Sequence, residues 1–264
     1  VLFRSTEVVA TKEAGIFEKE KICVLINENS ASASEILAGV VQDLDRGEVI
    51  GRRSYGKGLV QEQFALPDNA AIRITVARYY LPSGRCIQKD YSHGKNEYQQ
   101  EIYERFFRGK TADTSVALPK ERKKYFTTSG KVVYGDEGVK PDLTIQYDTL
   151  YNSTMDSVFR YNLIDLFAAQ YFYFHKNEFA SYTDETAFEK SFNVQPVLRN
   201  LLYQYLHSQL HSAVTATLHP FQSKMDNLLK AAFAKLKLGN NARTMILNTN
   251  DQTVKAAVLQ LKKN

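Results

Sequence analysis

The sequence lacks the features that mark several classes of protein. Its 264 residues include two cysteines, too few for the disulfide framework of a small secreted domain. No apolar stretch approaches the length of a membrane-spanning helix, so we expect no integral membrane segment. The 34 basic and 29 acidic residues are interspersed, and the net charge of +5 comes without a localised basic patch interleaved with aromatics. We therefore expect no nucleic-acid partner.

The sequence also lacks a convincing metal motif. His207 and His211 are one helical turn apart, as in a zinc-binding helix. However, Ser208 stands where that motif carries its glutamate base, and no third ligand is evident. We therefore expect no metal and no cofactor.

The richest local pattern begins at Ile22 and ends at Gln61. An apolar run over 22–26 is stopped by Asn27-Glu28-Asn29, which predicts a strand buried on both faces. A serine-rich turn follows, and then apolar residues recur at helical spacing at Ile36, Leu37, Val40, Val41 and Leu44. The serines therefore lie in the turn between a predicted strand and a predicted helix.

Two interpretations of this serine turn are open. A helix start offers backbone N–H groups without intrahelical partners, so a serine hydroxyl there lies beside ready donors for an oxyanion. That favours Ser32 as a nucleophile. The spacing of Ser32 and Glu35 equally fits a capping box, in which the two residues satisfy each other's backbone donors.

A glycine–lysine turn over 51–58 admits several interpretations. Gly51 to Lys57 matches the start of a phosphate-binding loop, but Gly58 stands where serine or threonine should hold magnesium, and a β-like stretch follows. Nucleotide binding is therefore disfavoured. Lys57 could act as the general base for Ser32, in the serine–lysine variant of nucleophilic catalysis. It could also be a solvated lysine in a turn.

Residues 27–36, 38–43 and 51–61 closely resemble the C-terminal processing peptidases, also called tail-specific proteases. The resemblance continues through 66–68, 74–80, 82–85 and 138–142. It implies that Ser32 is the nucleophile, that Lys57 is the base and that Gln61 positions the lysine. It further implies an oxyanion N–H from Ala33 and a supporting role for Glu35.

The resemblance implies an α/β (or α+β) fold, with a crotonase/ClpP-like protease core of mixed β-sheet and packed helices. Helical patterns in the later residues predict an all-α C-terminal domain after this core. The resemblance implies a serine endopeptidase that acts on protein or peptide substrates, near C-termini or in unfolded regions, in a bacterial periplasm or envelope. It also implies that the usual chain has a PDZ domain and more core before this point. We therefore interpret the sequence as a C-terminal portion. A non-catalytic interaction module is the alternative, and oligomeric state is not predicted.

Composition divides the chain near residue 148. Residues 1–147 read as the protease core, with strands over 59–66 and 71–80 and an insertion at about 88–128 that holds a short helical stretch over 97–107. Residues 148–264 contain few glycines and predict helices over 155–175, 185–192, 195–212, 213–237 and 250–262. The aromatic cluster between Asp165 and Phe179 favours a helix core over a ligand cage.

Overall fold

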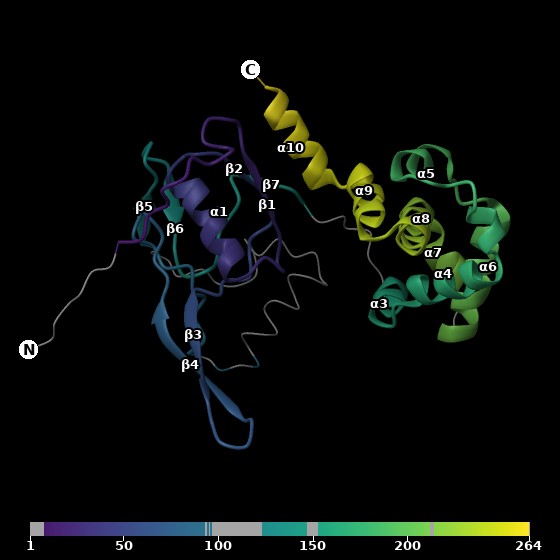
Figure 1. The fold of residues 1–264 in the computed structure, drawn as a ribbon, viewed down its shortest axis with the longest axis horizontal. Coiled ribbons are helices and arrows are strands. Elements are labelled where there is room, and N and C mark those ends of the chain that lie inside the picture. The colour runs from purple at the N-terminus through teal and green to yellow at the C-terminus, as the bar shows by residue number, and fades with distance from the viewer. Residues whose placement is uncertain are drawn as a thin grey trace, which may run out of the picture.

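The computed structural model describes residues 8–92, 94, 96, 123–146, 153–211 and 214–263. In Figure 1 the strands and helix α1 gather in the part before residue 147, and helices make up the part after it. Most of the predicted insertion at 88–128, including its helical stretch over 97–107, lies outside the described residues. The predicted boundary near 148 does too, so the division into two domains stays a prediction.

A three-stranded parallel sheet forms the centre of the first part. Its strands are β1 (Cys23–Ile26), β2 (Glu48–Gly51) and β7 (Leu143–Thr144), in the order β1-β2-β7. Helix α1 (Ala33–Asp43) follows β1, and Ala38 joins Ile26 and Val49 in a buried cluster. The helix therefore covers one face of the sheet, as expected for a parallel strand connection.

The other face of the sheet is covered by the last helix, α10 (Gln252–Lys262), which packs against β1 and β2. Alternation along β1 puts Cys23 on this face, and its Sγ lies 4.0 Å from the carbonyl oxygen of Ala257. The cover is incomplete, because Leu25 is 41% exposed although its neighbour Ile50 is fully buried. The prediction of a strand buried on both faces is thus wrong for β1.

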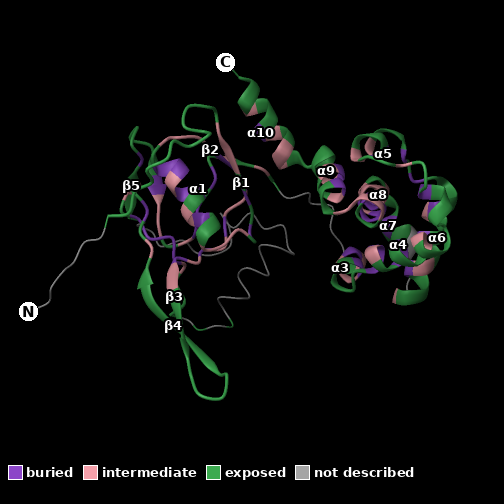
Figure 2. Ribbon diagram, viewed as in Figure 1, coloured by how far each residue is buried: buried purple, intermediate pink, exposed green. Residues whose placement is uncertain are grey.

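Two antiparallel pairs complete the described strands. β3 (Leu59–Ala65) pairs with β4 (Ala71–Arg78), and β5 (Lys124–Phe126) pairs with β6 (Val132–Tyr134). The β3–β4 turn has positive φ at Asp68 and Asn69, residue types that tolerate the left-handed region. This hairpin extends away from the sheet, and both of its strands are largely exposed (Figures 1 and 2).

The second part is helical, as predicted. Its elements before residue 212 are α3 (Ser153–Arg160), α4 (Leu163–Phe174), the 3-10 helix η1 (Lys176–Phe179), α5 (Glu185–Ser191) and α6 (Pro196–Leu210). After residue 213 they are α7 (Val214–Leu218), the 3-10 helix η2 (His219–Phe221), α8 (Gln222–Leu238), α9 (Asn240–Asn250) and α10. The mixture of strands and helices in the first part, followed by helices alone, confirms the predicted fold class.

Local residues explain where these helices differ from the prediction. The helix predicted over 155–175 is broken at Asn162, which takes a left-handed conformation with φ 52°. The helix predicted over 213–237 is interrupted by the 3-10 turn at Pro220, because proline lacks the N–H that an α-helix needs. Among the described helices, none combines the length and the apolar character that a bilayer crossing requires.

The aromatic cluster contributes to the helical core only on one side. Phe167 is buried, and Tyr171 and Phe172 pack against the same core. Tyr173 and Phe174 point away from it and are 66% and 74% exposed. The prediction of a helix core therefore holds for part of the cluster.

Candidate active site

Ser32 lies in the turn between β1 and α1, where the sequence predicted it. It is the residue that precedes the first turn of α1, with φ 58° and ψ −119°. Ordinary helix caps have extended backbone angles, so this conformation is unusual for a cap. The capping box predicted from the spacing of Ser32 and Glu35 is nevertheless present, because each side chain accepts the backbone N–H of the other residue. Non-glycine residues held in such regions are strained and gather at functional sites, including the strand-to-helix turns that expose a nucleophilic serine.

Lys57 lies on a turn that reaches the same edge of the sheet. β1 and β2 are parallel neighbours, so the turns that follow their carboxyl ends lie side by side. The N–H of Tyr55 donates to the carbonyl oxygen of Ser30 at 2.9 Å, and the N–H of Arg52 donates to that of Ile26 at 3.0 Å. These bonds hold the serine turn against the lysine turn.

The side chain of Glu35 joins the two turns more directly. Its Oε2 accepts the N–H of Ser32 at 2.9 Å and the N–H of Lys57 at 2.8 Å. Those two backbone nitrogens are therefore no further apart than the sum of these lengths. Its Oε1 accepts the N–H of Gly56 at 2.7 Å and the hydroxyl of Ser54. Four donors converge on one fully buried carboxyl group.

Ser54 links this arrangement to the segment around Val139. Its Oγ accepts the N–H of Val139 at 2.7 Å, and its own N–H donates to the carbonyl oxygen of Val139 at 3.1 Å. Gly138 approaches closely here, because a Cβ on it would lie 2.7 Å from the Ser54 hydroxyl. Ser54 was not predicted as a site residue. Its position three residues before Lys57 is evident in the sequence, but its hydrogen-bond partners come from distant segments.

Ala33 is the first residue of α1 and Gln61 lies on β3, and the roles implied for them stay predictions. The N–H groups of Ser34 and Glu35 donate to the preceding turn, whereas that of Ala33 has no partner within the described part of the chain. Gln61 lies on β3, where the register shifts between Val60 and Gln61. The extra residue is Val76 on β4, so the bulge lies in β4 opposite this point of β3.

Two arginines flank the lysine turn, and each is paired with a carboxylate. Arg52 Nε lies 2.6 Å from Glu28 Oε1, and Arg53 Nη1 lies 2.6 Å from Glu137 Oε2. Both pairs are largely shielded from solvent. The positive charge next to Lys57 in the sequence is therefore balanced in the structure.

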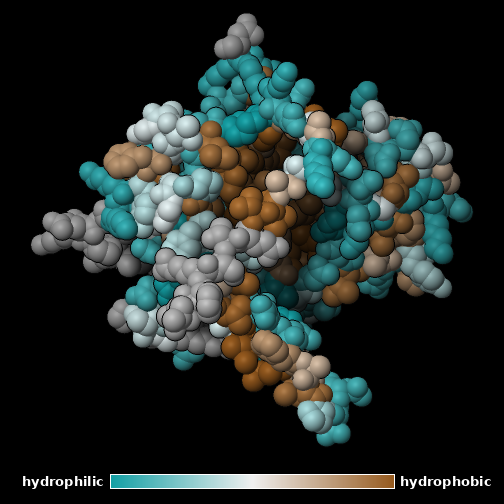
Figure 3. All heavy atoms as spheres, turned by 60° about the vertical axis from the view of Figure 1, so that its left-hand side comes forward, coloured by the Kyte–Doolittle hydropathy of each residue, from teal (hydrophilic) through white to brown (hydrophobic). Residues whose placement is uncertain are grey.

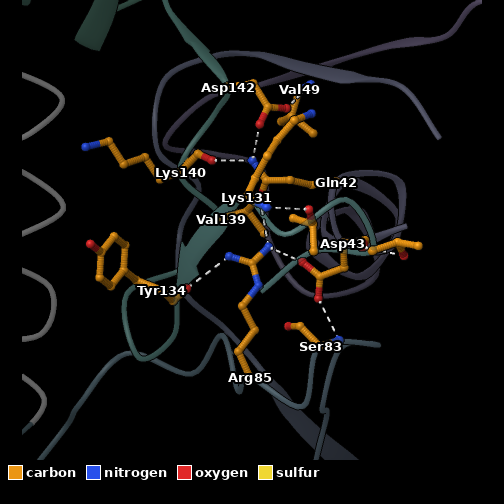
Figure 4. Close-up of polar contacts among 12 residues, drawn as sticks. Gln42, Asp43, Val49, Ser83, Arg85, Lys131, Tyr134, Val139, Lys140 and Asp142 are labelled. Atoms are coloured by element: carbon orange, nitrogen blue, oxygen red, sulfur yellow. Dashed lines mark hydrogen bonds and ion pairs between the residues drawn. The ribbon is translucent and has the colours of Figure 1, made fainter. Parts of the chain in front are cut away.

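The far end of α1 is anchored by a buried polar network, shown in Figure 4. Arg85 Nη2 lies 2.8 Å from Asp43 Oδ1, with both side chains buried, and also donates to Gln42 Oε1 at 2.7 Å. Burial lowers the pKa of the Arg85 guanidinium, and the charge of Asp43 opposes that shift. Gln42 in turn donates to Asp142 Oδ1 at 2.9 Å, and the other carboxylate oxygen of Asp142 accepts the N–H of Val49. The helix that begins at Ser32 is thus fixed to β2 and to the segment before β7.

The two histidines considered for a metal site lie at the C-terminal end of α6. His207 lies in the last turn of α6, whereas His211 ends that helix in a left-handed conformation with φ 50°. Among the described residues, no group of histidine, cysteine and acidic side chains could hold a metal ion.

The structure thus ties a serine with a strained backbone, at a strand-to-helix turn, through one carboxylate to a lysine turn. Comparison with known proteins shows what part of the chain is similar to. Residues 4–95 match the sequence model of Peptidase family S41. Over that segment the predicted resemblance to C-terminal processing peptidases is confirmed.

The relatives carry the same description in their names. A carboxy-terminal-processing protease of Bartonella bacilliformis is 51% identical over 77 residues, which are 29% of this chain and 18% of the relative. A carboxyl-terminal-processing protease of Picosynechococcus sp. is 41% identical over 98 residues, 33% and 24% of the two chains. A solved photosystem II D1 C-terminal processing protease is 28% identical, covers 46% of this chain and 19% of that one, and has a TM-score of 0.26. The chain therefore spans less than a quarter of the length of each of these relatives.

Proposed function

We propose that this chain supplies the nucleophile and the base of a serine endopeptidase that hydrolyses peptide bonds near protein C-termini or in unfolded proteins. The observation that carries the proposal is the Glu35 carboxylate, which accepts backbone N–H groups from both Ser32 and Lys57. A helix cap needs only the first of these bonds. The second ties the backbone of the lysine turn to that of the serine turn, which supports a dyad of Ser32 and Lys57.

The chemistry follows from the two side chains. Lys57 in its neutral form takes the proton of the Ser32 hydroxyl as the oxygen attacks the substrate carbonyl carbon. The oxyanion accepts a hydrogen bond from the Ala33 N–H, which the dipole of α1 reinforces. The lysine returns its proton to the leaving amine, and water hydrolyses the ester at Ser32. Gln61 positions the lysine side chain.

The setting of the enzyme belongs to the same proposal. We infer a division into a core over 1–147 and a helical domain over 148–264, and a place in a bacterial periplasm or envelope. The second inference rests on the C-terminal processing proteases among the relatives, which also include chloroplast enzymes. The substrates are unfolded chains or exposed tails, because a protease site must accept an extended backbone.

Cleavage of an unfolded reporter protein tests the dyad. We compare the wild-type protein with Ser32→Ala, Lys57→Ala and the matched control Ser34→Ala, which alters the neighbouring exposed serine. Ser32→Ala and Lys57→Ala should each lower the rate at least about a thousandfold, and Ser34→Ala should lower it less than about threefold. Cleavage that survives Ser32→Ala would refute the mechanism and make Ser32 a helix cap. Reporter binding without cleavage in the wild type would favour the interaction-module alternative.

A further inference from the structure

Ser54 and Glu35 are polar side chains that lie fully buried at the junction of the serine and lysine turns. In Figure 3 hydrophobic atoms lie on the surface of the lower projection, which is the β3–β4 hairpin, so the molecule exposes apolar groups while it encloses these two polar ones. Exposed apolar residues are common on protein surfaces, whereas a buried polar group costs free energy unless its hydrogen bonds are made. The partners of Ser54 therefore indicate its role.

The Glu35 carboxylate offers about four acceptor positions, and four donors occupy them. Its Oε2 accepts the N–H groups of Ser32 and Lys57. Its Oε1 accepts the N–H of Gly56 and the hydroxyl of Ser54. Three of these four donors belong to the backbone. The Ser54 hydroxyl is the one supplied by a side chain, so it is the one that a substitution can remove without changing the backbone.

The segment around Val139 holds the same hydroxyl from its other side. The N–H of Val139 donates to Ser54 Oγ at 2.7 Å, so this N–H occupies a lone pair of the hydroxyl while its proton is donated to Glu35. Gly138 has a φ of 84°, and a Cβ on it would lie 2.7 Å from Ser54 Oγ and 3.1 Å from the backbone nitrogen of Gly56. The backbone of this segment therefore packs directly against the lysine turn, at the point where Ser54 meets Glu35.

We propose that Ser54 is a positioning residue for the reaction proposed above. Its hydroxyl fixes the orientation of the Glu35 carboxylate, and the carboxylate in turn fixes the backbone of Ser32 and Lys57. The two carboxylate oxygens belong to one rigid planar group, so a rotation that follows the loss of a bond at Oε1 also moves Oε2. A displacement of about 1 Å at reacting groups can lower a rate about a hundredfold. This inference deepens the proposed function and rests on it for the reaction that Ser54 serves.

Steady-state cleavage of the unfolded reporter by Ser54→Ala tests the effect on catalysis. The value of kcat should fall at least about tenfold, because the two residues of the proposed dyad are displaced. The value of KM should stay within about threefold, because Ser54 is fully buried and does not itself contact the substrate. A kcat within about threefold of the wild-type value would overturn the proposal.

A second variant controls for a general loss of stability. Ser54→Ala leaves the N–H of Val139 without this acceptor, so the folded state should also become less stable. Val49→Ala is the matched control, because it removes buried side-chain volume from the same part of the chain and leaves all four donors of Glu35 in place. At a temperature where both variants are folded, Val49→Ala should keep kcat within about threefold of the wild-type value. An equal loss of kcat in the two variants would overturn the proposal.

Hydrogen–deuterium exchange tests the same link without substrate. The amides of Ser32 and Lys57 donate to Glu35, yet Ser54→Ala should speed their exchange at least about tenfold more than that of other core amides. In the Glu35→Gln background the same substitution should change it less than about threefold, because the carboxylate that Ser54 orients is already gone. Exchange that rises no more than elsewhere in the core, or equally in both backgrounds, would overturn the proposal.

The two measurements separate this inference from the proposed function. If Ser32→Ala cleaves the reporter as the wild type does, the serine mechanism falls, and the exchange measurement still decides whether Ser54 holds the two turns through Glu35. If Ser32→Ala abolishes cleavage while Ser54→Ala keeps the kcat of the wild type, the serine mechanism stands and this inference alone falls.

Discussion

Replacing Glu35 by glutamine probes the junction between the serine and lysine turns. The carboxylate accepts four hydrogen bonds, two on each oxygen. Glutamine keeps the shape but has one acceptor oxygen, so in either orientation its NH₂ group meets two of the former donors. Hydrogen bonds to a charged group contribute about 1.5–3 kcal/mol each. Losing two of them should destabilise the junction by about 3–6 kcal/mol.

Hydrogen–deuterium exchange measures this loss where it occurs. In native-state exchange, about 3–6 kcal/mol corresponds to roughly a hundred- to ten-thousandfold faster exchange of the amides at Gly56 and Lys57. The control is Glu62→Gln, which makes the same chemical change on the exposed β3 strand and should leave exchange within about twofold. If Glu35→Gln speeds exchange of these amides less than about threefold, the carboxylate does not hold the turns together and the reasoning fails.

Three further predictions concern other contacts. Arg85→Met leaves a buried carboxylate unpaired and should cost about 3–5 kcal/mol in urea unfolding of the core; a loss below about 1 kcal/mol would contradict it. Lys131 lowers the pKa of the Asp45 carboxyl, so the stability from this pair is complete above the ordinary carboxyl pKa and is lost as the pH falls below it. In Lys131→Met the free energy of unfolding should fall less as the pH is lowered. An unchanged pH dependence would refute the assignment of this stability to the Lys131–Asp45 pair. Ala257→Arg should undock α10 and speed exchange in β1 at least about tenfold, whereas Leu259→Arg on the exposed side should not; equal effects would count against the packing.

The parts of the site that depend on neighbouring residues could be predicted from the sequence. The apolar run ended by polar residues, followed by helical spacing from Ile36, gave the strand and helix around Ser32. Alternation along 71–78 and the polar turn before it gave the β3–β4 hairpin. These patterns are local, because each depends only on residues within one turn or one strand.

The parts that depend on tertiary contacts could not be predicted. The donors that converge on Glu35 include Ser54 and Lys57, which are 19 and 22 residues away. A capping box explained the position of Glu35 equally well, and only the folded chain reveals its additional partners. The helix over Asn240–Asn250 was missed because its asparagines and threonines are weak helix formers that tertiary packing overrides.

The position of α10 has a consequence for how the chain folds. Cys23 on β1 and Ala257 on α10 are 234 residues apart in the chain and meet in the native structure. A contact between such distant residues carries a large loop-closure entropy and forms late unless intervening parts are already compact. During synthesis one face of the strands that lead to Ser32 and Lys57 therefore stays uncovered until the helical part has been made. Of the described elements, strands β1 and β2 therefore leave the ribosome before the helical part and finish packing after it.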